Sequence, residues 1–141
     1  MRLISIPSDA VEVFWPVIAH LIEASTRRGG DTPDELRALC AESRGRLLVV
    51  VDDDNRPVLA GVAVLTGDPL VCQIIAAGGS GLREWRHLEP ELERWAAHHD
   101  AGELQFMGRL GWNMTARKAG FNVAPGTGNR AVYAKALRPT G

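Results

Sequence analysis

The chain has 141 residues, of which 45% are hydrophobic and 23% are charged, a composition typical of one soluble globular domain. Its 16 Lys and Arg nearly balance its 17 Asp and Glu, so charge predicts no binding to nucleic acid or to an anionic membrane. The apolar runs fall far below the roughly 20 residues of a membrane span. The N-terminus lacks the long apolar region of a signal peptide, and we therefore expect a cytoplasmic location.

Residues 3–6 predict the first strand, and apolar residues then recur at helical spacing. The expected apolar side of that helix consists of Phe14, Val17, Ile18, Leu21 and Ile22. Pro16 lies inside this pattern, where it would remove a backbone hydrogen bond from a helix interior. We therefore expect a turn over residues 9–14 and a regular helix from Trp15 to Arg27.

A capping box predicts the second helix. Thr32 and Glu35 have the required spacing, and Pro33 occupies the first helical position. The apolar segments 46–52 and 58–67 that follow predict an antiparallel hairpin.

Acidic residues and cysteines give no sign of a metal site. Asp52, Asp53 and Asp54 are consecutive at the predicted hairpin tip, which favours a solvated turn over a metal site. Cys40 and Cys72 are the only cysteines, and their spacing predicts reduced core residues rather than metal ligands. We expect no bound metal.

The central stretch of the chain is an apolar run over residues 70–77 that ends in glycines. The run is short and rich in β-branched side chains, which predicts a buried strand. Gly78, Gly79 and Gly81 would let the backbone turn and approach a ligand closely, and a helix is predicted to start near Leu82. The N–H groups at such a helix start attract phosphate. A glycine turn that binds nothing explains the pattern too, since no established phosphate fingerprint is present.

The last third of the chain completes the sheet. Pro90 interrupts the apolar stripe of the predicted third helix, so we expect a kink or a break there. Residues 102–107 predict a strand, and a short helix over 113–119 is followed by Gly120 as its C-cap. Two more strands are expected, the last over residues 131–137. We expect residues 1–138 to form one domain and residues 139–141 to be a disordered tail.

The predicted order is β-α-α-β-β-β-α-β-α-β-β. Together with the glycine turn after the fourth strand and the Gly120-Phe121 pair after the fourth helix, it resembles the GCN5-related N-acetyltransferase (GNAT) superfamily. The resemblance covers nearly the whole chain. It implies an α/β fold of the acyl-CoA N-acyltransferase type: a single domain with a mixed central sheet of six to seven strands and helices on both faces.

The resemblance also implies a site. In GNAT proteins the fourth and fifth strands splay apart and acyl-CoA enters the wedge, which here would lie between residues 73–77 and 104–107. The pyrophosphate of acetyl-CoA, or of another acyl-CoA, would rest on the glycine loop. The implied cofactor-binding residues are Ile75, Ala76, Ala77, Gly78, Gly79, Ser80, Gly81 and Leu82.

Two positions depart from the family pattern. Ala76 stands where the family has Arg or Gln, and Ala116 stands where many members have a Tyr that protonates the leaving thiolate. Asp68 and Glu103 are expected to border the wedge, but neither is assigned as the base. The catalytic residues are therefore unknown at this stage.

A narrower resemblance rests on the phrase Gly108-Arg109-x-Gly111-Trp112, which is similar to small GNAT-like proteins of bacteriophage, prophage and gene-transfer-agent genomes. Arg109 and Trp112 would bind substrate, the guanidinium pairing with an anionic group and the indole stacking on it. Alternatively, Trp112 packs the short helix and Arg109 caps a neighbouring C-terminus.

Three functions are compatible with these observations. The first is binding of acyl-CoA and transfer of an acetyl group to an amine of an unidentified small-molecule or protein acceptor. The second is a catalytically degenerate GNAT-like scaffold that acts as a binding or assembly component of a phage-like particle, which the substitutions at Ala76 and Ala116 favour. The third is a small-molecule sensor. The aromatic-rich segment Trp15–Ile22 could also supply a homodimer face.

Overall fold

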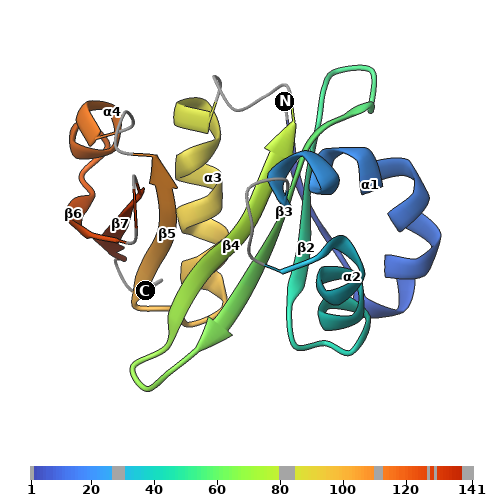
Figure 1. Cartoon of the computed structure of the whole chain (residues 1–141), viewed down its shortest axis with the longest axis horizontal. Coiled ribbons are helices and arrows are strands. Elements are labelled where there is room, and N and C mark those ends of the chain that lie inside the picture. Colours follow the sequence, from blue (N-terminus) through green and yellow to red (C-terminus); the bar gives the residue numbers. More distant parts are fainter. Residues whose placement is uncertain are drawn as a thin grey trace.

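The computed structural model describes residues 2–26, 31–79, 85–109, 113–126, 128 and 130–137. These residues form one seven-stranded sheet with the order β1-β2-β3-β4-β5-β7-β6, and helices cover both of its faces (Figure 1). The strands are β1 (Arg2–Ile6), β2 (Arg46–Val51), β3 (Pro57–Thr66), β4 (Val71–Gly79), β5 (Glu103–Arg109), β6 (Asn122–Pro125) and β7 (Arg130–Ala136). The helices are the 3-10 turn η1 (Ser8–Ala10), α1 (Val11–Thr26), α2 (Pro33–Ala41), α3 (Trp85–His98) and α4 (Asn113–Lys118).

The sheet is mixed, because β4 and β5 are parallel while all the other neighbouring pairs are antiparallel. A parallel neighbour requires a crossover connection, which α3 provides. The element order and the mixed sheet with helices on both faces confirm the predicted architecture. None of the helices described is long and apolar enough to span a membrane.

Helix α1 begins earlier than predicted. It starts at Val11, so Pro16 lies in its second turn rather than near its start, and the expected turn over residues 9–14 is wrong. Pro16 is exposed, so water can reach the carbonyl group that loses its backbone donor. The buried side of the helix is also different: Val11, Trp15, Ile18 and Ile22 face the core, whereas Phe14 and Val17 are exposed.

Helices α1 and α2 cover one face of the sheet, called here the α1 face. Their apolar side chains interlock with alternate residues of the neighbouring strands, as period-two strands require. This core consists of Ile6, Val11, Trp15, Ile18, Leu21, Ile22, Leu36, Cys40, Leu47, Val49, Val51, Ala60 and Val62. Both bonds of the predicted capping box are present at the start of α2, since the Glu35 amide donates to the Thr32 hydroxyl and the Thr32 amide donates to the Glu35 carboxylate.

Helices α3 and α4 cover the opposite face, called here the α3 face. Its core includes Leu48, Cys72, Leu104, Phe121 and Tyr133. Helix α3 continues through Pro90 without interruption, so a break at that residue is ruled out.

The predicted turns and free cysteines are confirmed. The Asp52 carboxylate accepts hydrogen bonds from the amides of Asp54 and Arg56, which closes the acidic turn. Gly120 ends α4 with a φ of 93°, a conformation that glycine adopts readily. Cys40 and Cys72 are free and buried, and burial raises the pKa of the Cys40 thiol to about 11 and that of Cys72 to about 12.

Candidate functional site

Strands β4 and β5 separate before either of them ends. Their parallel ladder runs from Val71 and Glu103 to Ile74 and Phe106, yet β4 continues to Gly79 and β5 to Arg109. Figure 1 shows the two strands diverging toward their C-terminal ends. The wedge therefore begins beyond Ile74 and Phe106, at residues 75 and 107, which lie within the ranges predicted from the family resemblance but two and three residues after their starts.

A β-bulge in β4 lies at the point of separation. Val62 of β3 is paired with Ala76 and Ala63 with Ile74, so Ile75 is the extra residue. A bulge bends its strand and increases the local twist. It therefore helps to turn the second half of β4 away from β5, and it leaves the Ile75 side chain 38% exposed.

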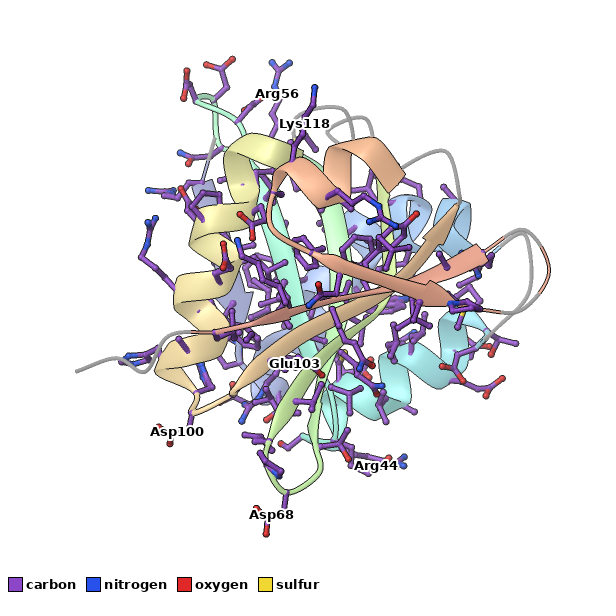
Figure 2. The ribbon with its side chains drawn as sticks, turned by 90° about the vertical axis from the view of Figure 1, so that its left-hand side faces the viewer. Arg44, Arg56, Asp68, Asp100, Glu103 and Lys118 are labelled. Atoms are coloured by element: carbon purple, nitrogen blue, oxygen red, sulfur yellow. The ribbon has the colours of Figure 1, made fainter. Side chains whose placement is uncertain are left out.

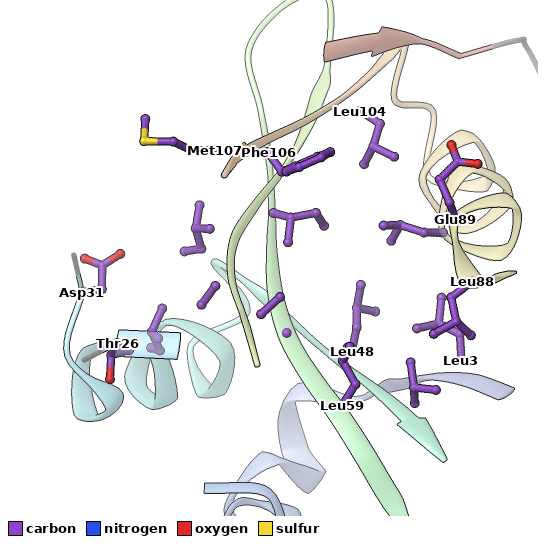
Figure 3. Close-up of a pocket in the computed structure, with 18 of the residues that line it drawn as sticks. Leu3, Thr26, Asp31, Leu48, Leu59, Leu88, Glu89, Leu104, Phe106 and Met107 are labelled. Atoms are coloured by element: carbon purple, nitrogen blue, oxygen red, sulfur yellow. The ribbon is translucent and has the colours of Figure 1, made fainter. Parts of the chain in front are cut away.

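A cavity of about 230 Å³ occupies the wedge and extends beneath α3. Figure 3 shows its lining, with Leu88 and Glu89 on α3, and Thr26 and Asp31 at the opposite side of β4. Most of the lining is apolar: the β4 and β5 residues are Ile74, Ile75, Ala76, Ala77, Leu104, Phe106 and Met107, and the α3 face adds Leu3, Leu48, Val50, Leu59, Leu88, Leu92 and Phe121. An apolar cleft with a few polar groups is the usual form of a small-molecule site.

The structure divides the predicted cofactor-binding residues into three groups. Ile75, Ala76 and Ala77 line the cavity. Gly78 and Gly79 still pair with β3, opposite Ala60 and Leu59. The remaining three, Ser80, Gly81 and Leu82, lie outside the described residues, as does the predicted phosphate loop that they form.

Gly79 has a structural reason to be glycine. Its φ is 137°, and a Cβ atom there would lie 2.3 Å from the Val58 carbonyl oxygen. Any side chain would therefore be pushed into the backbone of β3. Replacing Gly79 would disturb the pairing of β3 and β4 before it tested a ligand site, so this residue is a poor probe of phosphate binding.

The predicted substrate-binding residues are described only in part. The backbone of Arg109 pairs with Arg130 at the end of β5, and the position and partners of its side chain lie outside the described part of the structure. Trp112 lies outside it as well. Arg130 itself lines the cavity, and it is a cation at the wedge that the sequence interpretation missed.

Asp68 and Glu103 do not border the wedge. Asp68 lies at the outer tip of the β3–β4 hairpin and Glu103 at the start of β5, where the two parallel strands are still paired. Figure 2 shows the Asp68 side chain at the tip of this hairpin. The strands diverge at the opposite end of β5, so neither carboxylate faces the cavity.

The buried acidic residue at the cavity is Glu89, which the sequence interpretation missed. In the sequence, Glu89 lies within the apolar stripe of α3, four residues after Trp85 and three before Leu92. A charged residue at an apolar position of the helical pattern is the sequence signal that could have identified it. Its side chain is 7% exposed. Burial raises the pKa of the carboxyl to about 7, with a further increase from the neighbouring Glu93 and a partial decrease from Lys135.

Lys135 of β7 links the Glu89 carboxyl group on α3 to the end of α4. Its Nζ lies 3.4 Å from an oxygen of Glu89 and 3.1 Å from one of Glu93, and it donates to the Ala119 carbonyl at 2.6 Å. The pKa of Lys135 is raised, because the two carboxylates outweigh the opposing effect of burial. The cluster therefore fixes the end of α4 to α3 and holds a carboxyl that titrates near neutral pH.

Tyr133, the only tyrosine, does not occupy the family position of the acid. It is fully buried and stacks on Phe106 with 4.8 Å between ring centroids, and burial raises its pKa. Ala116, at the family position, is fully buried as well.

Solved structures of acetyltransferases share this fold. An aminoglycoside 6'-acetyltransferase type Ii superposes with a TM-score of 0.73 over 100% of both chains at 16% sequence identity. Tetrahymena GCN5 has the same TM-score over 100% of this chain and 99% of its own at 7% identity. An acetyltransferase of the GNAT family from Staphylococcus aureus Mu50 gives 0.64 at 12% identity, covering 97% of this chain and 99% of its own.

No protein-family profile and no curated protein sequence matches the chain. At these low identities the structural similarity establishes the fold, which is the GNAT acyl-CoA N-acyltransferase fold expected from the sequence.

Proposed function

We propose that this protein binds acyl-CoA in the wedge between β4 and β5 and transfers the acyl group to an amine. The observation that carries the proposal is the end of the β4–β5 ladder at Ile74 and Phe106, with an apolar cavity of about 230 Å³ at the separation. The shared fold of solved acetyltransferases supports it.

The residues at the wedge fit such a cofactor. From Ile75 to Gly79, the edge of β4 that faces β5 has no ladder partner among the described residues. Backbone amides and carbonyls on that edge can pair with the amide groups of an extended pantetheine arm. Acyl-CoA, when bound, supplies an activated thioester.

The chain itself would contribute positioning and exclusion of water. The apolar lining around Ile74, Phe106 and Met107 would keep water away from the thioester, which limits hydrolysis. A neutral amine entering at the splayed edge would then form a C–N bond to the acyl carbon as the C–S bond breaks, so that CoA leaves as the thiolate and the amine releases one proton to solvent.

Calorimetric titration with acetyl-CoA tests the cofactor site, with CoA and ATP as comparison ligands. We expect micromolar binding of acetyl-CoA and much weaker binding of ATP. Absence of acetyl-CoA binding at millimolar ligand would overturn the proposal. Release of free thiol in the presence of a panel of amines would then test transfer.

A pair of variants locates the site. Ala77→Phe places a ring at the β4 wall of the cavity and is expected to weaken acetyl-CoA binding at least about tenfold through steric exclusion. Ala134→Phe makes the same change on β7, at a half-buried position that does not line the cavity. This control should bind as the wild type does, and an equal loss in both variants would contradict the assignment of the site.

A further inference from the structure

The cavity is larger than an acetyl group needs. An apolar cavity of roughly 150 Å³ already accommodates benzene, and the one here measures about 230 Å³. The end of the pantetheine arm would fill the part of this volume that Ile75, Ala76 and Ala77 line, whereas a methyl group on the thioester would not reach the part that Leu3 lines. The size of the cavity therefore needs its own explanation.

Part of the cavity lies beneath α3, where Leu88, Glu89 and Leu92 line it. That helix makes its principal contacts with the sheet at β1 and β5, the strands on either side of β2, β3 and β4. It thus bridges the middle of the sheet, and the cavity extends under the bridge as far as Leu3 of β1. Three strand spacings separate β4 from β1, or roughly 14 Å.

The polar groups of the cavity are unevenly distributed. Thr26 and Asp31 lie on the α1 side of β4, and Arg130 lies at the start of β7. Under α3, the only charged side chain among the described lining residues is Glu89. The other residues there are Leu3, Leu48, Val50, Leu59, Leu88 and Leu92.

This distribution suits a ligand with a polar end at the wedge and an aliphatic end under α3. The amides of a pantetheine arm would find few hydrogen-bonding partners among these leucines, whereas a hydrocarbon chain needs none. We propose that the cavity beneath α3 binds the aliphatic chain of an acyl group of about six or more carbons. This inference rests on the proposed acyl-CoA site and specifies its substrate class.

Calorimetric titration of the full chain with acetyl-CoA and hexanoyl-CoA tests the inference. Each buried methylene adds up to about fourfold in affinity, so hexanoyl-CoA should bind at least about tenfold more tightly than acetyl-CoA. Free hexanoate is a third ligand, which separates binding of a thioester from binding of a fatty acid. Hexanoate that binds as tightly as hexanoyl-CoA would overturn the thioester assignment.

Filling the part of the cavity that lies over β3 should remove the preference selectively. Leu59→Phe adds volume there, and we expect the affinity ratio to fall to about threefold or less while acetyl-CoA binding is retained. Leu65→Phe is the matched control, because Leu65 lies on the same strand, packs against the α3-face core, and does not line the cavity. It should keep the wild-type ratio.

Leu3→Phe is a second blocking variant, on the edge strand β1, and it decides the question if Leu59→Phe does not fold. Equal affinities of the wild type for the two thioesters would overturn the chain-length inference and leave the proposed function intact. Binding of neither thioester would overturn both. A ratio that stays high in both blocking variants would place the acyl chain elsewhere.

Discussion

The two faces of the sheet differ in how their side chains are packed. On the α1 face, side chains from α1, α2 and four strands form one continuous core, which meets the cavity at Leu36 and Ala76. On the α3 face, the helix spans the sheet above a cavity, and a carboxyl group is buried at its wall. Because a well-packed interior stabilises and an unfilled one does not, the α1 face provides the scaffold and the α3 face provides space for a ligand.

The contrast is clearest at two neighbouring residues of β2. Leu47 is fully buried on the α1 face, and Leu48 is 4% exposed on the α3 face, where it lines the cavity. They share a residue type, a strand and nearly the same burial, so they differ mainly in what surrounds them.

The largest expected effect is the loss of stability when each of these two leucines is replaced by alanine. Leu47→Ala should lower the free energy of unfolding by about 3–4 kcal/mol, because it opens a new cavity at a buried position that does not line the existing one, whereas Leu48→Ala should cost about 2 kcal/mol, since part of its surroundings is already empty. Denaturant unfolding of both variants measures the difference. Equal losses would show that the α3 face is as tightly packed as the other.

The next effect concerns the buried carboxyl. The pKa of Glu89 is raised to about 7 from 4.5, so the folded protein holds a proton that the unfolded chain releases between these values. Wild-type stability should therefore fall as pH rises through that window. Glu89→Gln does not titrate, and its stability relative to the wild type should improve by on the order of 2 kcal/mol from pH 5 to pH 8.

Unfolding curves at several pH values measure this shift. The charged groups that face Glu89 are Glu93 on the same helix and Lys135 from β7, and Lys135 is also held by the carbonyl of Ala119 at the end of α4. Parallel pH profiles for the wild type and Glu89→Gln would mean that Lys135 keeps the carboxylate ionised in the folded state.

The smallest effect is expected on the outer side of α1. Val13 is 74% exposed, so Val13→Ser should change the free energy of unfolding by less than about 0.5 kcal/mol. The same experiment tests whether a second copy covers α1 next to the segment Trp15–Ile22, for which a homodimer face was predicted. A larger loss, or a melting temperature that depends on protein concentration, would show that a second copy covers this side chain.

Local signals predicted much of the fold. The capping box at Thr32 and Glu35, the hairpin turn at Asp52 and the helix-ending Gly120 each depend on a few neighbouring residues, and all three are present. The run of strands and helices follows from periodicity in the same way. The predicted start of α1 was wrong. Pro16 predicts a helix boundary from local sequence, whereas the packing of Val11 and Trp15 against the sheet stabilises the helix on the N-terminal side of Pro16.

The sequence by itself determined the order of elements, their turns and the resemblance that identified the fold. Only the tertiary structure decided where β4 and β5 separate, since that point depends on a bulge opposite Val62. It also brought Glu89 and Lys135 together across 46 positions of the chain and left the space beneath α3. These features arise from contacts between distant segments, which local patterns of residue type do not encode.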